Sequence, residues 1–136
     1  MNPDLIKLVV GGVVGAHGVG HVMGWIQAWG IARIEGASSR SWLFTDLLGD
    51  GATRALGGAM WLAPTIGFVI AAAGLFTGQS WWRPVAVGSA VVSLAAIALF
   101  WDALPMGSRV GAIGINVAVV AGLLVANWPS AATIGS

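Results

Sequence analysis

Five polar or ionisable side chains stand within or at the edge of long apolar segments: His17, His21, Arg54, Asp102 and Asn116. An ionisable group inside a membrane span costs a few kcal/mol or more, so each such group is a functional hypothesis that needs a partner. His17 and His21 are four residues apart, which places them on one face of a helix. Counted along the predicted spans, the five positions fall in the same half of a bilayer, so we expect them to form one cluster.

The simplest cluster pairs Asp102 with Arg54 and uses His21 and Asn116 to satisfy the remaining hydrogen-bonding groups. Such a network can serve only to hold helices together. Alternatively, it forms a small polar pocket that binds a lipid headgroup, a quinone or a metal ion, or that passes a proton. The sequence leaves the structural and the functional interpretation open.

The histidine spacing limits which cofactors can bind. Two histidines four apart on one helix point the same way, so they cannot clamp one haem from opposite faces. A single histidine remains a candidate axial ligand to a haem or a chlorin, because the glycines of AHGVGH would let a flat ring approach the backbone. His17 and His21 are also weak candidates for a shared metal ion, with Asp102 as a third ligand. Haem, chlorin and quinone therefore remain open, and no metal is assigned.

The composition indicates what must position these residues. Of 136 residues, 57% are apolar and 8% are charged, whereas soluble domains carry about 25% charged residues. The chain is therefore predicted to be an all-α membrane protein with one membrane domain over 1–136. A net charge of +1 without a basic cluster argues against nucleic-acid binding. The absence of cysteine excludes disulfides and thiolate ligands.

Four apolar segments are long enough to span a bilayer, and they cover about 5–31, 55–77, 84–104 and 110–128. Pro105 and Gly107 are expected to end the third segment. The links at 78–83 and 105–109 are short, which forces successive spans to run in opposite directions. We therefore predict an antiparallel four-helix bundle.

The loop between the first two spans contains the sequence SRSWLFTDLLG, with Leu43, Phe44, Leu47 and Leu48 at helical spacing. This pattern predicts a short amphipathic helix over about 39–49 that lies flat in the headgroup region. The acidic residues of the loop are expected to be solvated, and they are Glu35, Asp46 and Asp50.

Basic residues predict the orientation in the membrane. Four arginines fall on the side of the long loop, whereas only Lys7 and Arg83 fall on the side of the termini. By the positive-inside rule, the long loop is cytoplasmic and both termini lie outside.

Small residues form stripes on three of the predicted spans, where close approach of helix backbones would stabilise the bundle. The stripes are Gly11, Gly15 and Gly18 on the first, Gly67, Ala71 and Gly74 on the second, and Gly114, Ala118 and Ala121 on the fourth.

The stretches AHGVGHVMGWIQAWGIA, TRALGGAMWLA and FWDALPMG resemble those of small bacterial four-span inner-membrane proteins, a group loosely similar to the DoxX-like membrane proteins. The resemblance covers most of the chain. It implies a bacterial inner-membrane location and a link to quinone-coupled redox systems, and its polar positions are His17, His21, Arg54, Asp102 and Asn116. The turn LPMGSR departs from the shorter, threonine-containing turn of the group, so no ligand contact is carried over to it.

Three functions are considered. The first is a ligand-binding or accessory component of a membrane system, such as a redox system, using the polar cluster. The second is a quinone- or lipid-linked membrane enzyme with His21 as general base and Asp102 orienting it. The third is a transporter or channel subunit. The expected partners are the lipid bilayer and a homo-oligomer or larger membrane complex.

Overall fold

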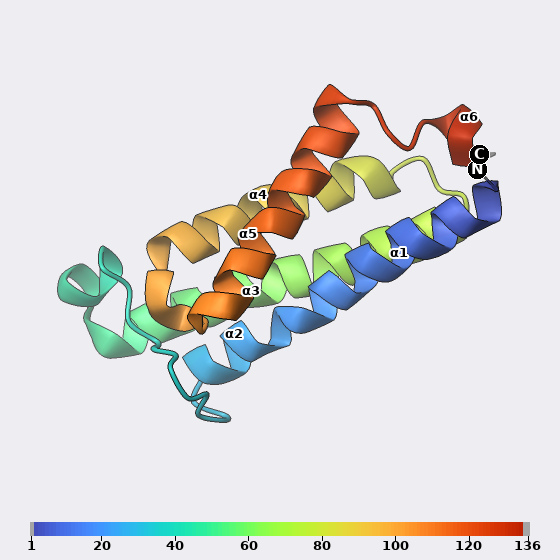
Figure 1. Ribbon diagram of the computed structural model, residues 1–136. Helices are drawn as coiled ribbons and strands as arrows, with labels where there is room; N and C mark the ends of the chain where they lie inside the picture. The colour runs from blue at the N-terminus through green and yellow to red at the C-terminus, as the bar shows by residue number, and fades with distance from the viewer. Residues whose placement is uncertain (1, 135–136) are drawn as a thin grey trace.

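A computed structural model describes residues 2–134, and the regular structure of these residues is helical throughout (Figure 1). Four helical stretches are long and apolar enough to cross a membrane: Pro3–Ala28, Phe44–Phe76, Trp82–Leu99 and Met106–Val125. The predicted class, an all-α chain with four candidate spans, is confirmed by their length and composition.

The first span consists of two helices, α1 (Pro3–Gly20) and α2 (Val22–Ala28), with His21 at their junction. The side chain of Asn2 caps α1 by accepting a hydrogen bond from the Asp4 N–H at 2.9 Å. At the junction, the His21 N–H donates to the Gly18 carbonyl, and the Gly24 N–H donates to the His21 carbonyl. Both bonds span three residues, which tightens the helix locally. The span predicted over 5–31 therefore bends at His21, and its helix ends at Ala28.

The second span belongs to α3 (Phe44–Phe76), which also absorbs the helix predicted over 39–49. Gly49 has φ 78° and ψ 166°, so it breaks the helical geometry between a short first segment and the long remainder. The first segment begins at Phe44, and just before it the Ser41 hydroxyl accepts hydrogen bonds from the N–H groups of Leu43 and Phe44. The boundary predicted at residue 39 was therefore wrong.

The third span, α4 (Trp82–Leu99), ends five residues before the predicted boundary and is followed by the short 3₁₀ helix η1 (Trp101–Ala103). Two side chains of the long loop donate hydrogen bonds to backbone carbonyls at the end of α4. The Ser41 hydroxyl donates to the Leu99 carbonyl, and the Trp42 Nε1–H donates to the Ala98 carbonyl, each at 2.7 Å. The helix therefore ends where these side chains contact it, and not at the predicted stop at Pro105 and Gly107.

The fourth span is α5 (Met106–Val120), which continues as the π-helical turn η2 (Ala121–Val125) and is followed by the short helix α6 (Ala131–Ile134). It thus begins and ends earlier than the predicted 110–128. Arg83 of α4 holds its end by donating to the Leu123 carbonyl at 2.9 Å and to Asn127 Oδ1 at 2.8 Å. The same guanidinium also donates to the Pro129 carbonyl.

Figure 1 shows the chain running along α1 and α2, returning along α3, running back along α4 and then rising along α5. Helix α3 packs against α1, α2 and α4, whereas α5 packs mainly against α4. A Cβ added to Gly18 would lie 2.8 Å from the Phe68 Cβ and 3.1 Å from the Thr65 carbonyl oxygen, so the predicted packing stripe on the first span is confirmed. A Cβ added to Gly114 would meet nothing within 4 Å, so the packing role predicted for Gly114 was wrong.

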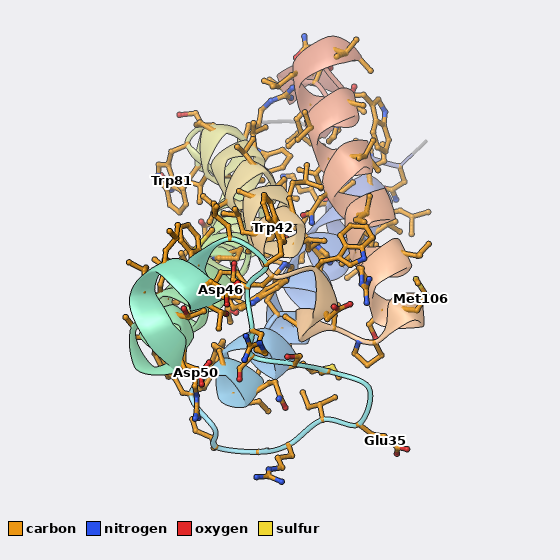
Figure 2. All side chains as sticks on the ribbon, turned by 90° about the vertical axis from the view of Figure 1, so that its left-hand side faces the viewer. Glu35, Trp42, Asp46, Asp50, Trp81 and Met106 are labelled. Carbon is orange, nitrogen blue, oxygen red and sulfur yellow. The ribbon has the colours of Figure 1, made fainter. Side chains whose placement is uncertain are left out.

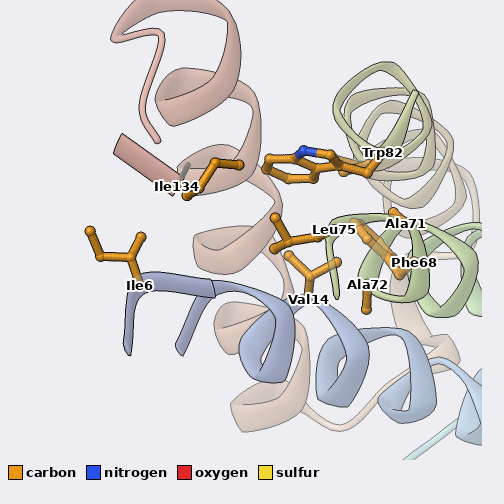
Figure 3. Close-up of a cluster of buried hydrophobic side chains, with 10 residues drawn as sticks. Ile6, Val14, Phe68, Ala71, Ala72, Leu75, Trp82 and Ile134 are labelled. Atoms are coloured by element: carbon orange, nitrogen blue, oxygen red, sulfur yellow. The ribbon is translucent and has the colours of Figure 1, made fainter. Parts of the chain in front are cut away.

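Two apolar clusters form the interior. One lies toward the termini and includes Val14 of α1, Phe68 and Leu75 of α3, Trp82 of α4 and Ile134 of α6, which Figure 3 shows close together. The other lies toward the long loop and is built around Trp61. The polar residues of the site lie between these clusters, beside Phe68 and Trp61.

Candidate functional site

Four buried side chains from three spans form a hydrogen-bonded ring. His17 Nε2 lies 3.0 Å from Asn116 Oδ1, and Asn116 Nδ2 lies 2.7 Å from Ser93 Oγ. Ser93 Oγ lies 2.6 Å from His21 Nε2, and His21 Nδ1 lies 2.8 Å from the His17 carbonyl oxygen. The ring therefore connects the first span to α4 and α5, and we call these four residues the polar ring.

The chemistry of the partners assigns a direction to every bond of the polar ring. A carbonyl oxygen only accepts, so His17 Nε2–H donates to Asn116 and His21 Nδ1–H donates to the His17 backbone. With neutral imidazoles, His21 Nε2 then carries a lone pair that accepts the Ser93 hydroxyl proton. Ser93 Oγ in turn accepts from the Asn116 amide. All four bonds are satisfied with both histidines uncharged, which suits an apolar interior.

Burial and aromatic side chains enclose most of the polar ring. Ser93 and Asn116 are fully buried, and His21 is only 3% exposed. The Phe68 ring lies edge-on to His17 with 4.9 Å between centroids, and the indole of Trp61 lies 5.8 Å from the His21 ring. No substrate can reach the Ser93 hydroxyl without opening the helix bundle, so the Ser93–His21 pair is not placed for hydrolysis.

Three of the five predicted site residues belong to the polar ring: His17, His21 and Asn116. The structure brings these three residues together from the first span and α5, whereas Arg54 and Asp102 lie outside the ring. Ser93 was not predicted, because a serine is not ionisable and can satisfy its hydroxyl within its own helix. Ser89, one turn earlier, does so by donating to the Val85 carbonyl. A small polar residue in the alanine-rich face of α4 was the available signal.

The predicted ion pair between Arg54 and Asp102 was wrong. Arg54 Nε–H donates to the Ala28 carbonyl at 2.9 Å and so caps α2. Asp102 lies in η1, outside the shortened α4, and its carboxylate is 3.4 Å from Arg109. Asp102 therefore cannot orient His21, whose Nδ1 is bonded to the His17 backbone.

Arg109 is a buried charge that the sequence analysis counted only for orientation. Its side chain is 6% exposed, and its NH2 group donates to the Leu104 carbonyl at 3.1 Å. Its guanidinium carbon lies 4.7 Å from the centre of the Trp101 ring. The opposite charges at 102 and 109, on either side of Pro105, were the signal for this contact.

The acidic residues of the long loop lie away from the polar ring. Figure 2 views the molecule from the loop end and shows Glu35, Asp46 and Asp50 at the surface. Asp46 and Asp50 are each 3.6 Å from Arg40, with both carboxylates largely exposed. These contacts are surface ion pairs, so the predicted solvated state agrees with the structure.

A cavity of about 440 Å³ lies against the polar ring, between the first span and α5. Ala16, His17 and Gly20 line one wall, and Ser108, Gly111 and Ile115 line the other. We call this cavity the ring groove. His17 Nδ1 has no hydrogen-bond partner among residues 2–134, and in the neutral ring assigned above it carries a lone pair.

These residues do not fit a haem or a chlorin. Both Nε2 atoms are engaged, by Asn116 and by Ser93, and His21 Nδ1 donates to the backbone. The remaining nitrogen, His17 Nδ1, is bonded to the ring carbon that carries the Cβ, where the helix itself would obstruct a large macrocycle. Over the described residues, no group of three His, Cys, Asp or Glu side chains could hold a metal ion. The third ligand considered for such an ion, Asp102, points to Arg109 instead.

The site therefore combines a satisfied polar ring with one unpartnered imidazole acceptor in a mostly apolar groove, in which Ser108 is a further polar side chain. Comparison of the chain with protein-family models, with curated proteins and with solved structures found no match.

Proposed function

We propose that this protein binds a lipophilic quinol in the ring groove, as a small ligand-binding or accessory component of a membrane system. In this proposal the four spans cross the bilayer as an antiparallel bundle, with the long loop on the cytoplasmic side and its short helical segment at the interface. The observation that carries the proposal is the unpartnered Nδ1 of His17 beside a cavity of about 440 Å³.

The position of the proton on the neutral His17 ring determines which ligand suits the groove. The carbonyl of Asn116 fixes the proton of His17 on Nε2, so Nδ1 is a hydrogen-bond acceptor. An acceptor in an apolar cavity favours a ligand that brings a donor, because an unpaired polar group in hydrocarbon is costly. A quinol has two hydroxyl donors, whereas the oxidised quinone has only carbonyl acceptors. We therefore expect the groove to prefer the reduced form.

The position of the groove suits a ligand that arrives through the membrane. His17 lies near the middle of the first span, and the groove walls belong to two helices that cross the apolar layer. Gly20 and Gly111 leave space at the walls, since a Cβ added to either would meet nothing within 4 Å. An uncharged aromatic ring can enter such a site laterally from the lipid, without crossing a charged surface.

The test uses duroquinol, a quinol without a tail, and nanodiscs that contain the purified protein. Under anaerobic conditions we expect these nanodiscs to retain more duroquinol than empty nanodiscs do. A preference of about fivefold over duroquinone is expected, since one net hydrogen bond contributes about 1 kcal/mol.

Two matched variants locate the binding site. Gly111→Leu places a side chain in the ring groove and should abolish the enrichment. Gly88→Leu places the same side chain on an open face of α4, away from the groove, and should leave the enrichment unchanged. Equal retention of duroquinol and duroquinone, or an unchanged enrichment in Gly111→Leu, contradicts the proposal.

A further inference from the structure

A second cavity continues the ring groove toward the termini. It has a volume of about 240 Å³ and shares Val13 and Ile115 with the ring groove. Its walls are apolar throughout, with Val9 and Val10 on α1 and Ala118 and Val119 on α5. We call it the upper groove. The two cavities adjoin at Val13 and Ile115 between α1 and α5, and we refer to them together as the channel. His17 and His21 both line its ring-groove half.

The channel has a defined length and a lined far end. From Met23 to Val9 the first span rises about 21 Å, at about 1.5 Å per residue. Trp128 and Pro129 line the upper groove beyond the end of α5. Arg83 holds this segment in place through the carbonyls of Leu123 and Pro129. Figure 3 shows Trp82, another residue of the upper groove, lying beside Val14 and Leu75.

We propose that the upper groove holds the isoprenoid tail of the quinol whose ring lies at His17. This inference rests on the proposed function and adds the ligand's class and orientation. The hydroxyl-bearing ring occupies the half of the channel that contains the acceptor, and the tail runs toward Trp128. The protein thus binds an amphiphile whose polar end lies in mid-membrane and whose tail points to the side of the termini.

A phospholipid chain does not suit the same channel. Its charged headgroup stays at the interface, whereas the acceptor of His17 lies near the middle of the span. A chain from the loop side reaches only about 15 Å, half of the apolar layer, and would end before the upper groove. A chain from the other side can lie in the upper groove, but it carries no hydrogen-bond donor for His17 Nδ1. An uncharged quinol ring can lie in mid-membrane, and its hydroxyl groups can donate to His17 Nδ1.

The tail should determine orientation more than affinity. Lipid chains are as apolar as the groove walls, so transferring the tail from lipid gives little hydrophobic gain. The informative measurement is therefore the position of the tail. The probe is a quinol with an isoprenoid tail that carries a photoreactive diazirine at its end, and crosslinked peptides are mapped by mass spectrometry in nanodiscs.

We expect crosslinks to concentrate in residues 9–14 and 118–129. Ala118→Phe, which fills the upper groove, should reduce labelling of these segments about tenfold, because a close-packed cavity leaves no room for the tail. The control is Val117→Phe, which adds an aromatic ring to the neighbouring, lipid-exposed position outside both cavities and should leave the labelling unchanged. Ala118→Phe should still retain tail-less duroquinol.

The outcomes separate this inference from the proposed function. If duroquinol binds but the tail probe labels the lipid-facing surface without preference, the tail assignment is wrong and the ring site stands. If a phospholipid with the same diazirine labels the two segments as strongly as the quinol probe, the upper groove holds ordinary lipid chains and the assignment is again wrong. If duroquinol itself is not retained, the proposed function fails.

Discussion

The two faces of the first span differ in how they meet their neighbours. Toward α3, Gly18 allows backbone contact, and a single added methyl group would collide with Phe68. Toward α5, the helices are separated by two cavities and joined by the hydrogen bond between His17 and Asn116. Close contact over small residues stabilises the first seam, whereas a directed polar contact spans the second. A ligand site fits the second seam because space and an acceptor occur there together.

The largest effect is expected when the tight seam is overfilled. Gly18→Leu should destabilise the fold by about 3 kcal/mol, because the new side chain meets the Phe68 Cβ and the backbone of Thr65. Gly12→Leu, on the same helix, is the control, since a Cβ added to Gly12 would meet nothing within 4 Å. Thermal unfolding followed by circular dichroism in lipid nanodiscs measures both. Equal melting temperatures for the two variants would show that the seam is not close-packed.

A smaller effect is expected when the polar link of the open seam is removed. Asn116→Leu keeps the number of side-chain heavy atoms and their branching at Cγ but deletes two hydrogen bonds, to His17 and to Ser93. The expected loss of stability is about 2 kcal/mol, since one buried donor is left unpaired. Ser108→Ala, on the same helix but outside the polar ring, should change stability little. If Asn116→Leu is as stable as the unmodified protein, the polar ring does not hold α5 to the first span.

The smallest of the three effects is expected within α4, and it sharpens the distinction between the polar ring and ordinary serine bonding. Ser93→Ala removes the bonds to His21 and Asn116 and should cost about 1 kcal/mol. Ser89→Ala removes only a bond to the same helix and should cost less. The two variants also differ in duroquinol retention, which should fall in Ser93→Ala because His21 and Asn116 lose their shared partner. Indistinguishable variants would make Ser93 an ordinary helix serine.

The wrong predictions of the span ends and of the Arg54–Asp102 ion pair share one physical origin. Helix ends were predicted from prolines and glycines close by in sequence, but distant side chains accompany the actual ends. Ser41 and Trp42 donate hydrogen bonds to backbone carbonyls at the end of α4, and Arg83 donates to the carbonyl of Leu123 near the end of α5. Because α4 ends early, Asp102 lies outside the helix and contacts Arg109 in place of Arg54.

The sequence by itself determined the class of this protein, since four apolar stretches with few charges leave helices as the structure that satisfies every backbone group in lipid. It also determined that His17 and His21 share a helix face, because periodicity along one helix is a local property. Only the tertiary structure decided that Asn116 and Ser93 complete a ring with them, and that Arg54 and Asp102 do not. The depth of a residue follows from counting along a span, whereas its partner depends on how each helix is rotated and where it ends. Those are set by packing between helices, which the order of residues in one span does not contain.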